Sequence, residues 1–160
     1  MVAATVSLML TKNPTLTTRQ IEDILYHTAT NMYEEGWDGM SGAGLLNATA
    51  ALKTEPGLYV FVKIDRITIN KDINKNVESV DVLVTARGPL SEFTVEAGKG
   101  KHPSEFKPVA GPYFKEVEHA WAAHIIAKDN LRASDEWVVR VKVKGKDGTE
   151  FFAQSLLLLK

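Results

Sequence analysis

Residues 136–159 read EWVVRVKVKGKDGTEFFAQSLLLL, and this stretch decides the fold. Its first part, Glu136–Lys144, alternates with a period of two, so that tryptophan and valine fall on one face and mostly basic residues on the other. Such alternation is typical of a β-strand with one buried face. Asp147-Gly148 is a strong signal for a two-residue hairpin turn, and Glu150–Leu159 supplies the strand that follows it.

The strand pattern extends back along the chain to Leu58. In the predicted strand that contains them, Val80, Val82 and Val84 share one face. The additional predicted strands are Leu58–Ile69, Val77–Ala86, Glu92–Ala97, Glu105–Val109 and Ala120–Ala127. Roughly seven short strands in about 100 residues are the signature of an antiparallel β-sandwich, here of immunoglobulin-like or fibronectin-like kind.

The residues before Pro56-Gly57 have helical patterns instead. Val2–Lys12 is apolar nearly all round, which is typical of a helix buried inside a larger protein. Asn13-Pro14 ends it, because the residue before proline disfavours the α region. A capping box from Thr17 to Gln20 begins a second helix, a glycine-rich loop spans 31–44, and residues 45–52 form a short last helix.

The change of composition predicts an α+β chain in two parts. Residues 1–55 form an incomplete helical segment, and residues 57–160 form the sandwich. The run Met1–Leu10 lacks a basic leader and a cleavage site, so we expect a buried helix there and not a signal peptide.

Composition excludes several classes of protein. The 160 residues are 44% hydrophobic, enough for a packed core, and carry 19 basic against 20 acidic residues, a net charge of −1. This balance gives no electrostatic case for binding nucleic acid or an anionic membrane. The chain has no cysteine, which excludes disulfides and thiolate metal sites. The chain has no run of about 18 apolar residues, so the sequence predicts no membrane span.

Four segments of the helical part occur in an order that carries a family resemblance. They are VAATVSLML at 2–10, NPTLT at 13–17, IEDILYHTA at 21–29 and GAGLLNA at 42–48. Together they resemble the C-terminal end of the catalytic domain of subtilisin-like serine proteases, over residues 2–52. The first helix and the last are then the remnant of an α/β protease domain.

The resemblance implies a parent enzyme that hydrolyses peptide bonds through an acyl-enzyme on serine. The family's triad and oxyanion asparagine match no residue here, so we expect no catalytic residue in this chain. We expect a Gly-Thr-Ser-Met-Ala-x-Pro motif just upstream of Met1. The resemblance also implies an extracellular, secreted protein, with calcium possible in the parent but no cofactor in this chain. The implied partners are the rest of the protease domain and the parent's protein substrates.

The apolar first helix has an energetic consequence. Burying its large side chains is worth about 10 kcal/mol, which rivals the net stability of a domain. The side chains concerned are Val2, Val6, Leu8, Met9 and Leu10. We therefore expect the helix to pack on the sandwich, to self-associate with another copy, or to be disordered.

The sandwich has two possible roles beside the protease. It either stabilises the catalytic domain or docks the enzyme onto a substrate or surface. The alternative is a stand-alone adhesion or polymer-binding module that is not involved in proteolysis.

One segment has the residue alternation of a calcium loop. Asp72, Asn74 and Asn76 offer oxygen ligands at the first, third and fifth positions, but Val77 and Leu83 replace the glycine and glutamate that such a loop needs. Asn and Asp are also ordinary turn residues. The three residues are thus a weak calcium candidate, with a plain turn as the alternative.

The histidines give no clear site. His119 and His124 are five residues apart, and on a regular strand they face opposite sides, so we expect no joint metal ligation. The other histidines are His27 and His102. Gly39-Met40-Ser41-Gly42 comes close to a nucleophile elbow, but no strand is predicted before it.

The remaining candidates have structural alternatives. An acidic group near Trp37 is either a ligand site or a solvated loop; its members are Glu34, Glu35 and Asp38. The aromatic residues Tyr113, Phe114, Trp121 and Trp137 either line a carbohydrate face or belong to core and rim, with Trp137 expected in the core.

Two local signals concern single residues. Asn47 fits a glycosylation pattern, but we expect it to begin the last helix. In the stretch from Phe93 to Phe106, Gly98 and Gly100 permit positive φ at a bulged turn, and Phe106 is expected to return to the core.

Overall fold

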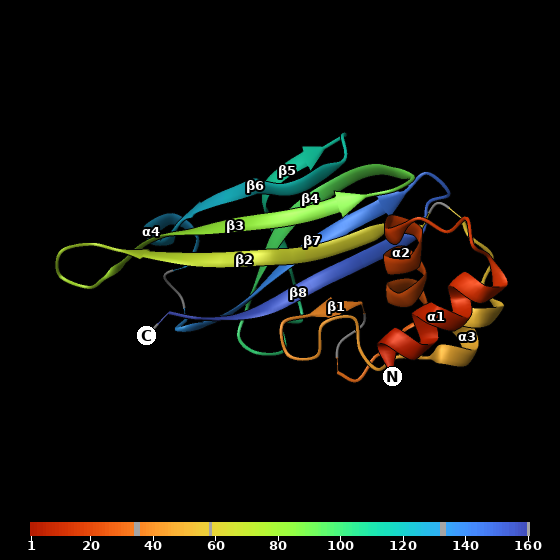
Figure 1. Ribbon diagram of the computed structural model, residues 1–160. Coiled ribbons are helices and arrows are strands. Elements are labelled where there is room, and N and C mark those ends of the chain that lie inside the picture. Colours follow the sequence, from red (N-terminus) through yellow and green to blue (C-terminus); the bar gives the residue numbers. More distant parts are fainter. Residues whose placement is uncertain (34–35, 58, 132–133, 160) are drawn as a thin grey trace.

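Three helices form the N-terminal part of the fold in the computed structural model, which describes residues 1–33, 36–57, 59–131 and 134–159. They are α1 (Val2–Lys12), α2 (Thr18–Thr28) and α3 (Ala48–Lys53) (Figure 1). Their buried side chains meet in a small cluster of Met9, Ile24 and Ala51.

The predicted caps at Thr17 and Asn47 are confirmed, but α3 begins at Ala48 and not at residue 45. The Thr17 hydroxyl accepts a hydrogen bond from the Gln20 amide at 3.2 Å, and the Thr17 amide donates to Gln20 Oε1 at 2.9 Å, which completes the capping box. Asn47 Oδ1 accepts from the Ala50 amide at 3.0 Å, so Asn47 caps α3 as expected. A cap side chain satisfies one of the amides that a helix start leaves without an intrahelical partner.

α1 is less buried than its sequence predicts. Val2, Leu8 and Leu10 are 54%, 55% and 37% exposed, whereas Met9 is 3% exposed. The helix is formed and packs on α3, with Lys12 Nζ donating to the Leu52 carbonyl at 2.9 Å. It is therefore neither disordered nor packed on the sandwich; one face is buried, and large apolar side chains beside that face are left partly in water.

The rest of the chain folds into two β-sheets. Five strands lie in the order β1-β8-β7-β4-β5 and three in the order β2-β3-β6. The strands are β1 (Trp37–Asp38), β2 (Phe61–Lys71), β3 (Val77–Arg87), β4 (Leu90–Lys99), β5 (Lys107–Tyr113), β6 (Val117–Ile126), β7 (Glu136–Gly145) and β8 (Glu150–Leu158). The predicted β-sandwich-like α+β fold, with few helices and two sheets, is confirmed.

The core lies between the sheets, where the alternating valines meet. Val80, Val82 and Val84 from β3 and Val139 and Val141 from β7 are fully buried. Trp137 belongs to the same cluster, as expected, and its indole N–H donates to the Ser134 carbonyl at 3.0 Å. A period of two with one apolar face thus places each strand correctly.

Several elements differ from the predicted boundaries. The predicted helix 45–52 is α3, which begins at Ala48, and the predicted strands Glu92–Ala97 and Glu105–Val109 are the longer β4 and the later β5. The predicted strand from Leu58 is β2, which begins at Phe61, and Leu58 itself lies outside the described residues. The predicted strand Ala120–Ala127 begins earlier, at Val117, and its last residue begins the short helix α4 (Ala127–Asn130).

A further strand appears within the predicted glycine-rich loop. Trp37 and Asp38 of β1 pair in parallel with Ala153 and Gln154 of β8. The chain before Pro56-Gly57 thus contributes an edge strand to the sandwich. In the described part of the chain, no helix is long and apolar enough to span a membrane.

Candidate functional site

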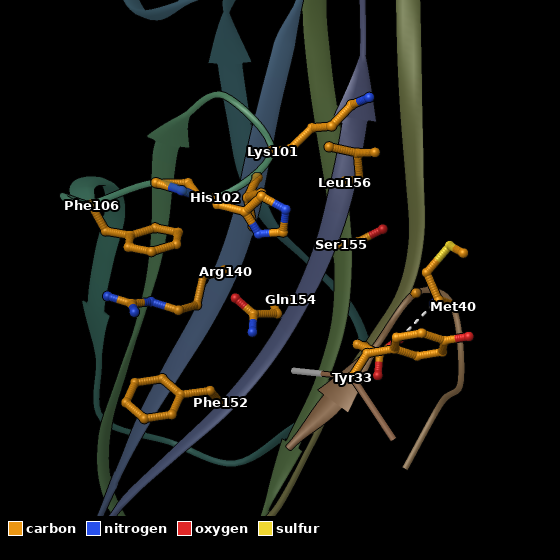
Figure 2. Close-up of a pocket in the computed structure, with 14 residues that line it drawn as sticks. Tyr33, Met40, Lys101, His102, Phe106, Arg140, Phe152, Gln154, Ser155 and Leu156 are labelled. Carbon is orange, nitrogen blue, oxygen red and sulfur yellow. Dashed lines mark hydrogen bonds between the residues drawn. The ribbon is translucent and has the colours of Figure 1, made fainter. Parts of the chain in front are cut away.

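A groove lies on the outer face of the five-stranded sheet. Its floor consists of side chains from β7 and β8, because Arg140 pairs with Gln154 and Val138 with Leu156 on the same side of the sheet. One wall is the segment 101–106 after β4, and the other is formed by Tyr33 and residues 38–40 (Figure 2). The cavity has a volume of about 540 Å³, a size that suits a small ligand or a short polymer segment.

Gly98 sets the position of the first wall. A Cβ at this residue would lie 2.5 Å from Pro103 Cβ and 3.0 Å from the Glu105 carbonyl oxygen. The loop therefore folds directly over the strand because residue 98 has no side chain. Gly98 was expected to supply positive φ, but positive φ occurs at Gly100, at +87°, and the role of Gly98 is close approach.

The second wall is held by Asp38. Its Oδ1 accepts hydrogen bonds from the Met40 and Ser41 amides, both at 2.7 Å, and its Oδ2 accepts from the Ser41 hydroxyl. Burial raises the pKa of Asp38, but the hydrogen bonds from Ser41 and Met40 outweigh it and leave the pKa below its ordinary value. The Ser41 hydroxyl is thus a loop cap, and the near-match to a nucleophile elbow is a tight turn. Glu34 and Glu35, predicted to lie near Asp38, are outside the described residues.

Arg140 occupies the floor between two aromatic rings. Its guanidinium carbon lies 3.6 Å from the centroid of Phe106 and 4.9 Å from that of Phe152. Nε and Nη2 both donate to Glu96 Oε2, at 2.8 and 2.5 Å. Because Glu96 neutralises the guanidinium, this part of the groove presents stacked planar surfaces instead of a free charge.

Phe106 does not return to the core as predicted. It is half-buried on the guanidinium of Arg140 and lines the groove. The prediction was wrong because Phe106 still belongs to the loop that passes over Gly98 on the outer face, and the next strand, β5, begins only at Lys107. Sequence reasoning identified the glycine pair but not Arg140, which lies on a strand distant in sequence.

His119 and His124 share one face, which contradicts the expectation from their spacing. Both side chains lie on the outer face of the three-stranded sheet. His124 Nδ1 is 2.6 Å from Asp81 Oδ1, and His119 Nδ1 is 3.3 Å from Asp65 Oδ1. The reason is two irregularities in the β3–β6 pairing, between Val82/Leu83 and Val84/Ala86, which shift the alternation of β6.

The other two histidines lie elsewhere. His27 is exposed at the end of α2 and stacks on Tyr59, with the ring centroids 4.3 Å apart. His102 lines the groove. Among the described residues, no group of three or more His, Asp or Glu side chains is placed to hold a metal ion.

Asp72, Asn74 and Asn76 come together at the turn between β2 and β3. Asp72 Oδ1 accepts from the Asn74 and Asn76 amides, both at 2.8 Å, and Oδ2 accepts from the Asn76 side-chain amide at 3.1 Å. These hydrogen bonds, that of the Asn76 side chain first, lower the pKa of Asp72. Each carboxylate oxygen already serves the loop's own donors, which is the arrangement of a plain turn.

The three aromatic residues proposed beside Trp137 are exposed to different degrees. Trp121 is 62% exposed, Phe114 68% and Tyr113 37%, whereas Trp137 is 9% exposed.

Comparison of the chain with protein-family models, with curated proteins and with solved structures finds no match.

Proposed function

We propose that this chain is the C-terminal part of a secreted subtilisin-like serine endopeptidase, in which an immunoglobulin- or fibronectin-like sandwich stabilises the catalytic domain. The ordered motifs of residues 2–52 support the family. Hydrolysis then takes place in the upstream part of the parent, and this chain supplies no catalytic residue. Any calcium belongs to the parent's catalytic part.

The open face of α1 supports a missing neighbour. Val2, Leu8 and Leu10 are large apolar side chains that leave a third or more of their surface in water. Leu8 and Leu10 flank the buried Met9 on opposite sides of the helix, which leaves α1 with apolar surface for a further neighbour. The rest of the catalytic domain is the partner that this face fits, because α1 otherwise has the composition of an interior helix.

The stabilising role rests on a single observation, the buried contact of Arg87. This residue ends β3, yet its Nη2 donates to Glu22 and Asp23 of α2 at 2.6 and 2.9 Å. Its Nη1 donates to Glu118 of β6 at 3.1 Å, and its guanidinium lies 4.1 Å from the centroid of Phe61. One side chain therefore joins the helical segment to two strands of the sandwich.

Two further contacts join α2 to the sandwich. Arg19 of α2 forms an ion pair with Glu116 at 3.0 Å, and Tyr26 packs against Phe61 with the centroids 4.6 Å apart. A docking module on a flexible tether needs no such contacts. A sandwich that stabilises the catalytic domain needs such contacts, because the two parts must move as one body.

The proposal is tested by active-site labelling. The full-length gene product and this chain are treated in parallel with a fluorophosphonate, which acylates activated serines. We expect a single labelled serine upstream of residue 1 in the full-length protein and none in this chain. Labelling or inhibitor-sensitive peptide hydrolysis by this chain alone contradicts the proposal, as does a full-length protein that takes up no label.

A second candidate, a stand-alone binding module, is supported by the groove between residues 101–106 and 38–40. Its stacked floor and apolar walls suit a ligand with flat apolar groups. An upstream reading frame without Gly-Thr-Ser would favour this candidate over the protease.

A further inference from the structure

Trp121 presents its indole on the open outer face of the three-stranded sheet. The side chain is 62% exposed, and the strand register places it in one row with Leu83 of β3 and Arg66 of β2. Helix α2 lies at one end of this sheet and α4 at the other (Figure 1). Aromatic side chains contribute much of the energy of interfaces, so an indole left open on a sheet face can serve as a contact surface for a ligand.

Each neighbouring row contains a histidine close to an aspartate, and one of the two is hydrogen-bonded. On one side, His124 Nδ1 lies 2.6 Å from Asp81 Oδ1, while Asn70 donates to Asp81 Oδ2 at 2.7 Å. The hydrogen bond with His124 lowers the pKa of Asp81, which keeps the carboxylate ionised. With Nδ1 engaged, the other ring nitrogen, Nε2, is directed away from the carboxylate, and the imidazole is 63% exposed.

The other side has the same arrangement around a buried carboxylate. Asp65 is only 6% exposed in its side chain, and its Oδ2 accepts from the Thr85 hydroxyl at 2.7 Å. Its Oδ1 lies 3.3 Å from His119 Nδ1 and 3.2 Å from Lys63 Nζ, but neither approach has the geometry of a hydrogen bond. The oxygen thus keeps hydrogen-bonding capacity, and the imidazole of His119 is 71% exposed.

The edge of β6 is closed to a second protein strand at this point. The Tyr113 hydroxyl donates to the Ala122 carbonyl at 2.6 Å and occupies an acceptor that an added strand requires. His119 has a φ of +48°, and the two register shifts bend the strand here. Irregular, occupied edges of this kind disfavour strand addition.

The charges around Trp121 select the class of ligand. The cations Lys63 and Arg66 balance the carboxylates of Asp65 and Asp81 when the histidines are neutral. A balanced surface does not attract an ionic polymer. It offers an apolar aromatic plane flanked on two sides by hydrogen-bonding groups, which complements a molecule with one apolar face and a rim of hydroxyl groups.

We propose that the Trp121 face, defined as Trp121 with His119 and His124, binds a neutral polysaccharide. A pyranose ring stacks on the indole, and the two exposed imidazoles form hydrogen bonds with hydroxyl groups on either side of it. The inference concerns the sandwich alone and does not depend on the protease proposal, so either can fail without the other.

The test is a binding titration of the whole chain with cellohexaose and chitohexaose, two neutral β-1,4-linked probes. We expect saturable binding of at least one probe, and Trp121→Ala to weaken it roughly ten-fold or more, with Trp121→Phe intermediate. His124→Gln should weaken it by a smaller factor. Ile73→Ala, which removes an exposed apolar side chain from the turn between β2 and β3, is the control and should bind as the unaltered chain does.

Three outcomes overturn the inference. The first is no binding of either probe by the folded chain. The second is equal binding by Trp121→Ala and the unaltered chain when both retain the same circular dichroism spectrum and melting temperature. The third is loss of binding in Tyr33→Ala with retention in Trp121→Ala, which assigns the ligand to the groove.

Discussion

Arg87 and Asp23 form a buried ion pair, with Nη2 and Oδ1 2.9 Å apart and side chains that are 9% and 8% exposed. Burial disfavours the charged guanidinium, but the hydrogen bonds that it donates to Glu22 and Asp23 outweigh this effect and raise the pKa of Arg87. The pair links residues that lie far apart in the sequence. This contact therefore holds α2 against the sandwich.

Arg87→Met should lower the free energy of unfolding by about 3 kcal/mol, because it leaves the buried carboxylate of Asp23 without its partner. Urea unfolding followed by fluorescence measures the change. Arg19→Met is the matched control: it breaks the exposed pair with Glu116 and should cost less than about 1 kcal/mol. Equal effects of the two substitutions would show that Arg87 is not the principal link.

The pair of Asp81 and His124 predicts a pH dependence of stability. The folded-state pKa of Asp81 lies below its ordinary value of 3.8, chiefly because of the hydrogen bond with His124. The contribution is therefore fully present above the ordinary value and is lost as the pH falls through the folded value. Asp81→Asn should be less stable than the unaltered chain at pH 7, and the difference should shrink between roughly pH 5 and pH 2. Urea midpoints across this range provide the measurement; a difference that grows on acidification contradicts the assignment.

Gly98→Ala should displace the segment 101–106 and destabilise the protein by about 1–3 kcal/mol, because the new Cβ overlaps Pro103. Pro103→Gly removes the overlapping atoms. The double variant should therefore recover part of the loss, beyond the sum of the two single changes. Thermal melts of the four proteins measure the coupling, and strict additivity would mean that the contact is not the constraint.

Leu8→Glu should leave the stability of this chain within about 0.5 kcal/mol, because Leu8 is mostly in water. The same change should abolish self-association of the isolated chain, which we expect through the apolar face of α1. Sedimentation velocity measures association. Met9→Ala, its buried neighbour on the same helix, is the comparison and should cost about 2 kcal/mol or more in stability. A chain that is monomeric before substitution contradicts this role of α1.

The regular parts of the fold could be predicted from the sequence because their signals are local. The capping box of Thr17 and Gln20 fixes the start of α2, and the alternation in Glu136–Lys144 fixes the buried face of β7. Each depends on residues within one element. The α+β arrangement with a sandwich follows from counting such elements.

The surfaces depended on features that no spacing rule contains. His119 and His124 share a face only because β6 has irregular pairing with β3. Arg140 meets Phe106 only because residue 98 lets a loop cross the strand. Such sites arise from register and close approach between distant segments, so a sequence pattern shows the residues without showing which ones meet.

The parallel pairing of β1 with β8 has a consequence for biosynthesis. Trp37 leaves the ribosome well before its partner Ala153 is made. The edge strand must wait, unpaired, until β8 has been made, and contacts between such distant segments form slowly. A nascent chain that stalls before Glu150 therefore has an unfinished sheet and also a loose segment from α2 to α3, which makes it a recognisable substrate for chaperones and for quality-control proteolysis.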